Sequence, residues 1–342
     1  MKKRVVLRAD GSSTIGFGHV YRLMALAEIL SDFFDCIFLT KEAPPIVRQQ
    51  LEIFCKELFL IPAGDEKEEF FFVKEKIAKN DILVLDGYNF SEEYQIAIKG
   101  NGNKLVCLDD TAERHFFADV VINHAEAVNA SVYQKEAYTK LYLGVQYALL
   151  RKPFLELAKK RRELSKEVNI FIAFGGTDAY DLPLEALRVC QQIEGVNTIY
   201  LVLGNDVSAN ERIQQFVRAS GKKIHLKSNA SAIEMIAMME LCKIAIVSAS
   251  TISYELSCVQ IGMIAIRTVA NQQRLSDFLC REGLAQVITF EKEKIARDML
   301  EQLNKLLDNE MLIVEQMSRQ HIFFDGCSGE KLISVFHNLA HD

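Results

Sequence analysis

A histidine that follows a glycine-rich loop is the first group in this chain suited to chemistry. The segment RVVLRADGSSTIGFGHVYRLMALAEIL begins as a short apolar strand and ends as an amphipathic helix, so the loop joins a strand to a helix. Gly11, Gly16 and Gly18 allow positive φ and close backbone approach. The N–H groups at a helix N-terminus attract phosphate, and His19 can exchange a proton near neutral pH. The segment therefore predicts an anion site beside a titratable group.

This loop matches neither standard nucleotide-binding motif. Its glycines run G-x4-G-x-G instead of G-x-G-x-x-G, and no Lys-Ser/Thr pair follows, so the sequence gives little support for NAD or ATP. We expect no cofactor. Glycines at such turns can serve the turn alone, but Asp10, Ser12, Ser13 and His19 around them favour a functional loop.

Further polar residues follow other apolar strands of the first half. Asp86 and Tyr88 come at the end of ILVLD, Asp109 and Asp110 at the end of LVCLD, and His124 after VVIN. In doubly wound α/β folds the carboxyl ends of the strands face the ligand. Each residue also has a structural interpretation: the aspartates as helix caps, the tyrosine as a rim aromatic and the histidine as a core group. The sequence leaves both interpretations open.

A second group of candidates lies in KIAIVSASTISYELSCVQIGMIAIRTVANQQ. Ser250 and Thr251 form a turn between a strand and a helix, where hydroxyls can donate to phosphate. Glu255 lies one turn into that helix, where a carboxylate can bind two adjacent ribose hydroxyls. The structural alternative makes Ser250 the N-cap and Glu255 a solvated helix residue. A polar loop with Asn271 and Gln272 follows the next strand.

Short apolar strands alternate with helical stretches throughout the chain. The strand candidates are RVVLR, CIFL, ELFLI, ILVLD, LVCLD and DVVI in the first half and NIFIAF, TIYLVL, KIHL, KIAIVS, MIAI and QVITF in the second. Such unalternating runs predict parallel sheets covered by helices. The second half opens with its own strand and glycine turn, NIFIAFGGTD, which contains Gly175 and Gly176. We therefore predict an α/β protein of two Rossmann-like domains, with a ligand cleft between the carboxyl ends of their sheets.

The length of the chain also favours two domains, because 342 residues exceed what one hydrophobic core usually holds. The highly charged stretch 151–168 lacks a strand signal and predicts a connecting helix. This places the boundary near residue 160. The predicted domains are 1–160, with the histidine loop, and 161–342, with the C-terminal helices.

Composition argues against several classes of protein. A net charge of −6 gives no general attraction to nucleic acid or to an anionic membrane, so any phosphate site must be local. The eight cysteines lie scattered without a CxxC pair or a Cys/His cluster, which favours buried thiols over zinc ligands or disulfides. The N-terminal apolar run is too short for a signal peptide, and no run approaches the roughly 20 apolar residues of a membrane span. The cytoplasm is the expected compartment, and nothing indicates an oligomeric state.

Taken together, these segments resemble the family of UDP-2,4-diacetamido-2,4,6-trideoxy-β-L-altropyranose hydrolases of pseudaminic acid biosynthesis. The resemblance runs from Arg8 to about Gly283. The segments that carry it, in the family's order, are RADGSSTIGFGHVYRLMALA, LDGYNF, LDD, YLGVQYALLRKPF, FGGTD, SASTISYE and ANQQ. The run YALLRKPF is the most distinctive, because turn or core chemistry alone does not demand it.

The resemblance implies the GT-B fold, in which two Rossmann-like domains with parallel sheets face each other across a cleft. The related UDP-GlcNAc-dependent glycosyltransferase of peptidoglycan synthesis also has Gly-His at this turn, so His19 alone fits a hydrolase or a transferase. The start Arg8-Ala9-Asp10 and the YALLR segment favour the hydrolase. The SAST turn departs from the glycine pair of related transferases.

For the reaction, the resemblance implies hydrolysis of the UDP-sugar to UDP and the free sugar, with water attacking the anomeric carbon with inversion. His19 would be the base for this water, and Tyr88 and Asn271 would lie near the reacting sugar. Asp10 would either organise the loop or orient His19. No metal is required if backbone N–H groups and helix dipoles carry the charge of the leaving group.

For binding, the resemblance implies that Glu255 holds the uridine ribose and that Ser250 and Thr251 hold the diphosphate. The remaining candidates for substrate binding are Gly16, Gly18, Gly175, Gly176 and Gln272. Two alternatives stay open: a GT-B glycosyltransferase that uses a UDP-sugar, and a nucleotide-sugar-binding protein without catalysis.

Overall fold

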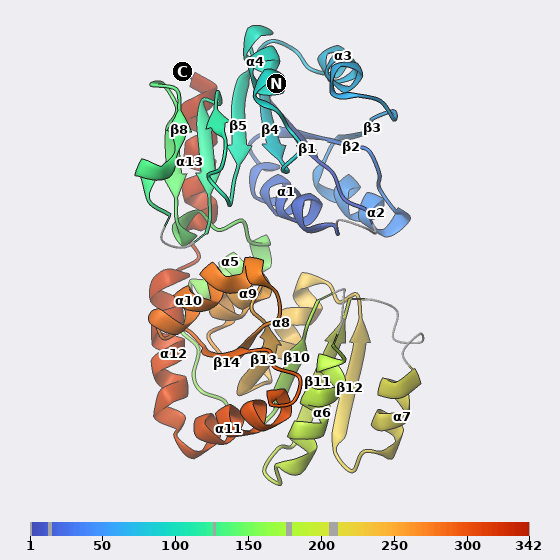
Figure 1. Cartoon of the computed structure of the whole chain (residues 1–342), viewed down its shortest axis with the longest axis vertical. Coiled ribbons are helices and arrows are strands. Elements are labelled where there is room, and N and C mark those ends of the chain that lie inside the picture. Colours follow the sequence, from blue (N-terminus) through green and yellow to red (C-terminus); the bar gives the residue numbers. More distant parts are fainter. Residues whose placement is uncertain (1, 13–15, 126–127, 176–179, 205–210, 342) are drawn as a thin grey trace. The chain divides into compact units, whose positions relative to one another are not determined.

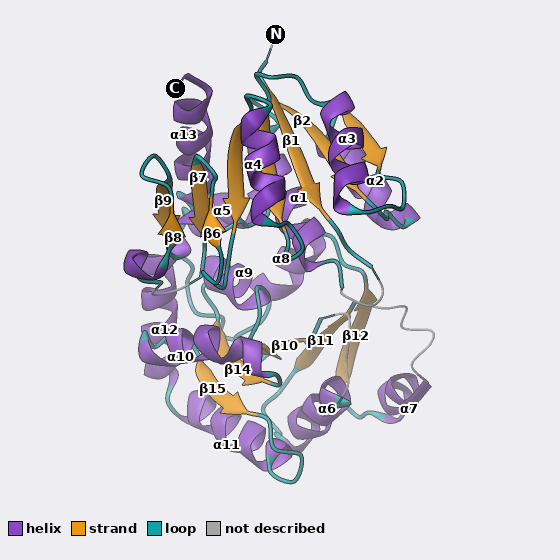
Figure 2. Ribbon diagram, turned by 45° about the horizontal axis from the view of Figure 1, so that its top comes forward, coloured by secondary structure: helices purple, strands orange, loops and turns teal. Residues whose placement is uncertain are grey.

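Two parallel β-sheets with helices packed against them organise the chain (Figure 1). The computed structural model describes residues 2–12, 16–125, 128–175, 180–204 and 211–341. Contacts divide the chain into two units, the first formed by Met1–Lys152 and Cys327–Asp342 and the second by Pro153–Gly326. Strands and helices alternate along the chain in both units (Figure 2).

The first unit is built on a seven-stranded sheet. Its strands are β1 (Arg4–Ala9), β2 (Asp35–Thr40), β3 (Glu57–Leu60), β4 (Ile82–Asp86), β5 (Lys104–Leu108), β7 (Val120–Asn123) and β9 (Lys140–Leu143). They lie in the order β3-β2-β1-β4-β5-β7-β9, and every neighbouring pair is parallel. A separate pair joins β6 (His115–Phe116) to β8 (Gln134–Lys135). The helical segments are α1 (Gly18–Leu30), α2 (Pro45–Phe54), α3 (Glu66–Lys76), α4 (Glu92–Gly100), η1 (Ala130–Val132), η2 (Val145–Tyr147) and α13 (Ser328–His341).

The core of the first unit follows from the alternation of side chains along buried strands. Val6 and Leu83 point to one face, where they pack with Val73 of α3 and Ile98 of α4. Their strand neighbours point to the opposite face. Helix α1 packs on β1 and buries its apolar stripe, including Leu23. This packing fixes the start of α1, and hence His19, against the carboxyl end of β1.

The second unit has a six-stranded parallel sheet. Its strands are β10 (Ile170–Ala173), β11 (Thr198–Leu203), β12 (Lys223–Ser228), β13 (Ile244–Ser248), β14 (Gly262–Arg267) and β15 (Gln286–Thr289). They lie in the order β12-β11-β10-β13-β14-β15. The helical segments are α5 (Lys152–Ala158), α6 (Leu182–Gln192), α7 (Glu211–Ala219), α8 (Ala232–Glu240), α9 (Ile252–Val259), η4 (Ala270–Gln272), α10 (Gln273–Arg281), α11 (Ile295–Asp308) and α12 (Glu310–Phe323).

Both strand orders are those of a Rossmann fold, so the prediction of two Rossmann-like parallel sheets is confirmed. In each sheet the order reverses once, between β1 and β4 in the first unit and between β10 and β13 in the second. Loops leave such a switch point in opposite directions, which opens a crevice for a ligand. All twelve predicted strands are present. Strands β6, β8 and β9 were not predicted, because they are short and mostly half-exposed and therefore lack a buried apolar run.

The division of the chain differs from the predicted domains 1–160 and 161–342 in two respects. The first unit ends at Lys152, and the predicted helix over 151–168 is only the short α5. In addition, α13 returns to the first unit. There Ser328 donates a hydrogen bond to the carbonyl of Ala148 at 2.9 Å, and Phe336 packs on Phe34. An amphipathic helix suits either sheet, so its linear position did not reveal its partner.

All eight cysteines are free thiols, and Cys280 is the one that is exposed. The prediction of buried thiols therefore holds for most of them and is wrong for Cys280. Burial raises the pKa of several of these thiols, for example that of Cys190 to about 12. Among the described residues, no helix is long and apolar enough to cross a membrane.

Candidate active site

The switch point of the first sheet brings His19 and Asp86 together. His19 is the second residue of α1, which follows β1, and Asp86 is the last residue of the neighbouring strand β4. The Nδ1 atom of His19 lies 2.8 Å from Oδ1 of Asp86. The Asp86 side chain is fully buried, whereas that of His19 keeps 20% of its surface exposed. The sheet thus supplies a fixed carboxylate to a histidine that solvent can reach.

Arg22 holds the Asp86 carboxylate in its ionised form. Its Nε donates to Oδ2 of Asp86 at 2.7 Å, and its Nη2 donates to Oδ1. Burial alone would raise the pKa of Asp86, but the charge and hydrogen bonds of Arg22, followed by those of His19, outweigh it and lower this pKa. Burial likewise opposes the charge of Arg22, and Asp86 more than compensates by raising the arginine pKa.

The contacts of His19 assign its tautomer. A carboxylate oxygen at 2.8 Å from Nδ1 accepts a hydrogen bond, so Nδ1 carries the proton. The Nη2 atom of Arg22, 3.0 Å from Nδ1, is a second donor that converges on the same oxygen of Asp86. With the proton on Nδ1, the Nε2 atom of the neutral ring is the one that can accept a proton. This is the arrangement of a histidine base oriented by a carboxylate.

Tyr88 completes the cluster through Asp110. Its hydroxyl donates to Oδ2 of Asp110 at 2.9 Å, and Nη1 of Arg22 donates to the same oxygen at 3.3 Å. The Tyr88 ring meets the imidazole of His19 edge to face, with centroids 5.0 Å apart. Burial and then the charge of Asp110 raise the pKa of Tyr88 to about 12, so the phenol keeps its proton at neutral pH. We refer to His19, Arg22, Asp86, Tyr88 and Asp110 as the histidine network.

Asp10 belongs to a neighbouring ion-pair cluster instead. Both of its carboxylate oxygens accept from the fully buried Arg8, at 2.6 and 2.7 Å, and the backbone N–H of Lys41 donates to it at 2.9 Å. Arg8 also donates to Glu69 at 2.8 Å. Burial would raise the pKa of Asp10, but Arg8 outweighs it and lowers this pKa. Of its two expected roles, these contacts favour the organisation of the loop, and Asp86 takes the place of the group that orients His19.

Asp109 and His124 are held by structural contacts. Oδ2 of Asp109 accepts the backbone N–H of Ala112 at 2.8 Å and the hydroxyl of Tyr133 at 2.9 Å. The Nδ1 atom of the buried His124 accepts the backbone N–H of Leu149 at 3.3 Å. Burial, followed by the charge of Arg22, lowers the pKa of His124 to about 4, so this ring is neutral at physiological pH. Their structural interpretation is therefore the better supported one.

The glycines of the first loop differ in their reasons for being glycine. Gly16 has a φ of +78° and forms an isolated bridge with Ser12. A Cβ atom on Gly11 would lie 2.5 Å from the ring of Phe17, so this position needs space instead of positive φ. Gly18 has neither constraint and simply begins α1. Ser13 lies outside the described residues.

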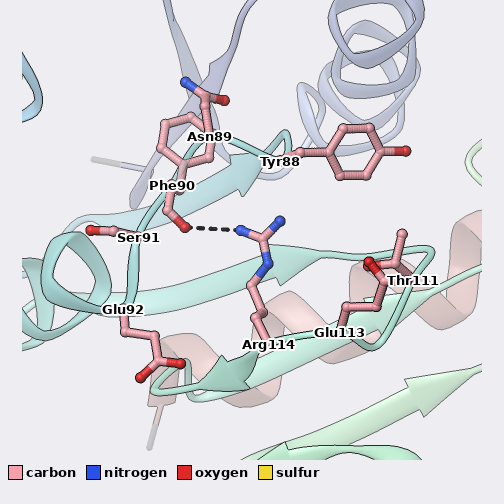
Figure 3. A pocket seen from close by; sticks show the side chains of 8 residues that line it. All are labelled: Tyr88, Asn89, Phe90, Ser91, Glu92, Thr111, Glu113 and Arg114. Atoms are coloured by element: carbon pink, nitrogen blue, oxygen red, sulfur yellow. Dashed lines mark hydrogen bonds between the residues drawn. The ribbon is translucent and has the colours of Figure 1, made fainter.

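A pocket of about 610 Å³ is lined in part by Tyr88 (Figure 3). Residues 88–92, which follow β4, line one side, and residues 111, 113 and 114, which follow β5, line the other. The guanidinium of Arg114 donates to the carbonyl of Phe90 at 2.9 Å and to that of Gly87 at 3.4 Å. Arg114 thereby ties the loop that carries Tyr88 to the loop after β5. The volume is within the usual range for a small-molecule site.

In the second unit, the predicted binding residues follow the same edge of their sheet. Thr251 is the exposed residue that precedes α9, and Ser250 lies before it with its hydroxyl 2.9 Å from that of Ser248. The N-cap position therefore falls on Thr251, which makes no side-chain capping bond, and not on Ser250. Glu255 lies in the first turn of α9 and is half-buried.

The neighbouring strands add the other candidates. Gly175, with a φ of +84°, follows β10, while Gly176 lies outside the described residues. Asn271 is exposed in η4, after β14. The side-chain carbonyl of Gln272 accepts the backbone N–H of Thr268 at 2.8 Å, so this residue shapes its own loop. Because β10, β13 and β14 are neighbours, all these residues lie at the carboxyl edge of one sheet.

The role of Arg22 and the pairing of Asp86 with His19 were not predicted from the sequence. Arg22 follows His19 by three residues on α1, which places both on one face of a helix. That spacing was the available signal. Across the described residues, no cluster of three or more His, Cys, Asp or Glu side chains is placed to hold a metal ion.

No protein-family model matches the chain. A UDP-2,4-diacetamido-2,4,6-trideoxy-β-L-altropyranose hydrolase from Campylobacter jejuni is 28% identical over 284 residues, which cover 82% of this chain and 97% of the relative. The chain is a relative of this hydrolase family. The resemblance inferred from the motifs is thereby confirmed. The spore coat polysaccharide biosynthesis protein SpsG from Bacillus subtilis is 26% identical over 285 residues, which cover 81% of each chain.

Among solved structures, MurG from Acinetobacter baumannii superposes with a TM-score of 0.67 at 15% identity, covering 98% of this chain and 99% of that chain. An identity this low shows the fold alone. The GT-B fold class predicted for this chain is confirmed by this likeness.

Proposed function

We propose that the chain hydrolyses UDP-2,4-diacetamido-2,4,6-trideoxy-β-L-altropyranose to UDP and the free sugar, a step of pseudaminic acid biosynthesis. The relation to the hydrolase family supports the substrate class. The observation that carries the mechanism is the 2.8 Å contact between Nδ1 of His19 and the buried carboxylate of Asp86. It leaves Nε2 as the basic atom of a histidine that solvent can reach.

In this mechanism, Nε2 of His19 takes a proton from water as that water attacks the anomeric carbon. The C–O bond to UDP breaks on the opposite face, so the configuration inverts. The imidazolium that forms is stabilised by Asp86, which is already ionised through Arg22. A positioned general base of this kind contributes about 10²–10⁴-fold to the rate.

The second unit supplies the groups that would hold UDP. Ser250 and Thr251 precede α9, and the partial positive charge at the start of a helix suits a diphosphate. Glu255, one turn into the helix, would accept hydrogen bonds from the ribose. Asn271 would contact the sugar from its exposed turn. Because helix N-termini and backbone N–H groups can carry the charge of the leaving diphosphate, we propose that the reaction needs no metal.

The test is UDP release from this substrate with no acceptor added, with and without EDTA. If the chain is a hydrolase, it should release UDP and free sugar in equal amounts, at the same rate with and without EDTA. NMR should show the inverted anomer as the first product. A strong rise in UDP release on adding a carbohydrate or lipid acceptor would indicate a glycosyltransferase. Tight binding of the substrate without turnover would indicate a binding protein.

A further inference from the structure

We propose that the pocket lined by Tyr88 recognises the acylamino N–H and hydroxyl groups of the sugar, with Tyr88 and Glu113 as hydrogen-bond acceptors. This inference rests on the proposed function and adds to it the part of the site that selects the sugar. It concerns only the pocket lined by residues 88–92, 111, 113 and 114 in the first unit.

The hydroxyl protons around this pocket are already engaged by the protein. Tyr88 donates to Asp110 at 2.9 Å, and Ser91 donates to Glu66 at 2.7 Å. Thr111 donates to Asp109 at 3.4 Å. A hydroxyl that has donated its only proton offers a ligand its lone pairs. Tyr88 in particular is held as an acceptor, because Asp110 is fixed in turn by Arg22.

The charged groups of the pocket also favour ligand groups that donate hydrogen bonds. The guanidinium of Arg114 points to the carbonyls of Phe90 and Gly87, as Figure 3 shows for Phe90. Glu92 and Glu113 are both exposed and line the pocket. Two carboxylates beside an arginine that already serves the backbone repel a diphosphate and attract N–H and O–H donors. The amide of Asn89 can serve either kind of ligand group.

The position of Tyr88 connects this pocket to the chemistry. Tyr88 contacts the imidazole of His19, with ring centroids 5.0 Å apart, and it also lines the pocket. A sugar with its anomeric carbon at His19 would therefore extend past Tyr88 toward Glu113. A diacetamido sugar presents two amide N–H donors on its ring, whereas the phosphates of UDP present only acceptors. The pocket consequently suits the sugar and not the diphosphate of the nucleotide.

The test compares Glu113→Ala and Glu113→Gln with the matched control Glu93→Ala. Glu93 is an exposed glutamate of α4 that does not line the pocket. Loss of a hydrogen bond from a neutral donor to a carboxylate should raise KM for the diacetamido substrate about 10-fold in Glu113→Ala. Glu113→Gln keeps an acceptor oxygen and should recover part of this loss. We expect kcat and the Kd of UDP, measured by calorimetry, to stay within about two-fold of wild type.

Binding of the free diacetamido sugar, followed by NMR, gives a readout that does not need turnover. It should weaken in Glu113→Ala and not in Glu93→Ala. An unchanged KM and unchanged sugar binding in Glu113→Ala, or an equal loss of UDP affinity, would overturn the inference. Absence of UDP release by the wild-type protein would instead refute the proposed reaction, so the two failures are distinguishable.

Discussion

The two sheets share the Rossmann strand order, but their carboxyl edges differ in chemical character. At the edge of the first sheet, charged and aromatic side chains of the histidine network hold one another through hydrogen bonds, and Asp86 is completely buried. At the edge of the second sheet, hydroxyl residues precede the start of α9, with Thr251 exposed and free of a capping bond. The first edge fixes side chains, and the second presents the start of a helix.

This difference indicates how one fold can divide a reaction between two units. Proton transfer needs a base whose tautomer is set beforehand, which requires a buried ion and partners that compensate for its desolvation. A diphosphate can be bound by donors that carry no net charge of their own, which a helix N-terminus supplies through its backbone. We therefore expect substitutions in the histidine network to act on kcat and those at the start of α9 to act on affinity for UDP.

The largest effect should come from His19→Asn. Asparagine can still donate to Asp86 but cannot take a proton from water, so kcat should fall about 10²–10⁴-fold. Because the second unit is proposed to hold UDP, the Kd of UDP measured by calorimetry should stay within about two-fold. His225→Asn, at an exposed position on β12, is the matched control and should keep full activity. A His19→Asn protein that retains more than a tenth of the rate would remove the general base from the mechanism.

A smaller loss of rate should follow Asp86→Asn. An amide can present its N–H to Nδ1 of His19 and so favour the tautomer with the proton on Nε2, which is inactive as a base. We expect kcat to fall about 10- to 100-fold, measured together with its pH profile, less than for removing the imidazole. Asp110→Asn is the matched control, since it also removes a carboxylate that pairs with Arg22 but does not touch His19. Equal losses in the two variants would mean that charge around Arg22, and not the tautomer of His19, matters.

Features that depend on residues close together in the sequence were predictable, and features that depend on contacts between distant segments were not. Apolar runs such as ILVLD and KIAIVS predict buried strands directly, because burial on both faces is a local property of the run. The glycine loop before His19 is likewise a local feature of the sequence, and it identified this residue as a candidate. In contrast, the contact between His19 and Asp86 depends on β1 and β4 being neighbours across a crossover, which no local pattern contains. The return of α13 to the first unit is a second case, since its apolar stripe has no feature that selects one sheet.

In the second unit, Glu255→Gln should act on binding. If the half-buried carboxylate accepts hydrogen bonds from two ribose hydroxyls, its loss should raise the Kd of UDP about 10-fold and change kcat by less than about two-fold. The sharper measurement is the ratio of the affinities for UDP and 2′-deoxy-UDP, which should approach one in the variant. Glu301→Gln, on the exposed side of α11, controls for the loss of a surface charge. An unchanged ratio would place the ribose elsewhere and weaken the division of labour between the two units.

The smallest expected effect is a difference in how acid destabilises the two sheets. The folded-state pKa values of Asp10 and Asp86 are lowered, in each case because an arginine outweighs the opposing effect of burial. Their ionic form therefore stabilises the first unit above the unfolded-state pKa of about 3.9, and this contribution is lost as the pH falls through the lower folded values. Burial raises the pKa of Asp81, which opposes the trend in the same unit. Among the described carboxylates of the second unit, the lowered pKa is that of the fully exposed Glu234, where solvent screens the interaction. Amide hydrogen exchange at pH 3, compared with pH 7 after correction for the intrinsic rate, should thus rise more in β1 and β4 than in β10 and β13. Equal acceleration in the two sheets would show that the ion pairs of Asp10 and Asp86 do not stabilise the first unit through charge.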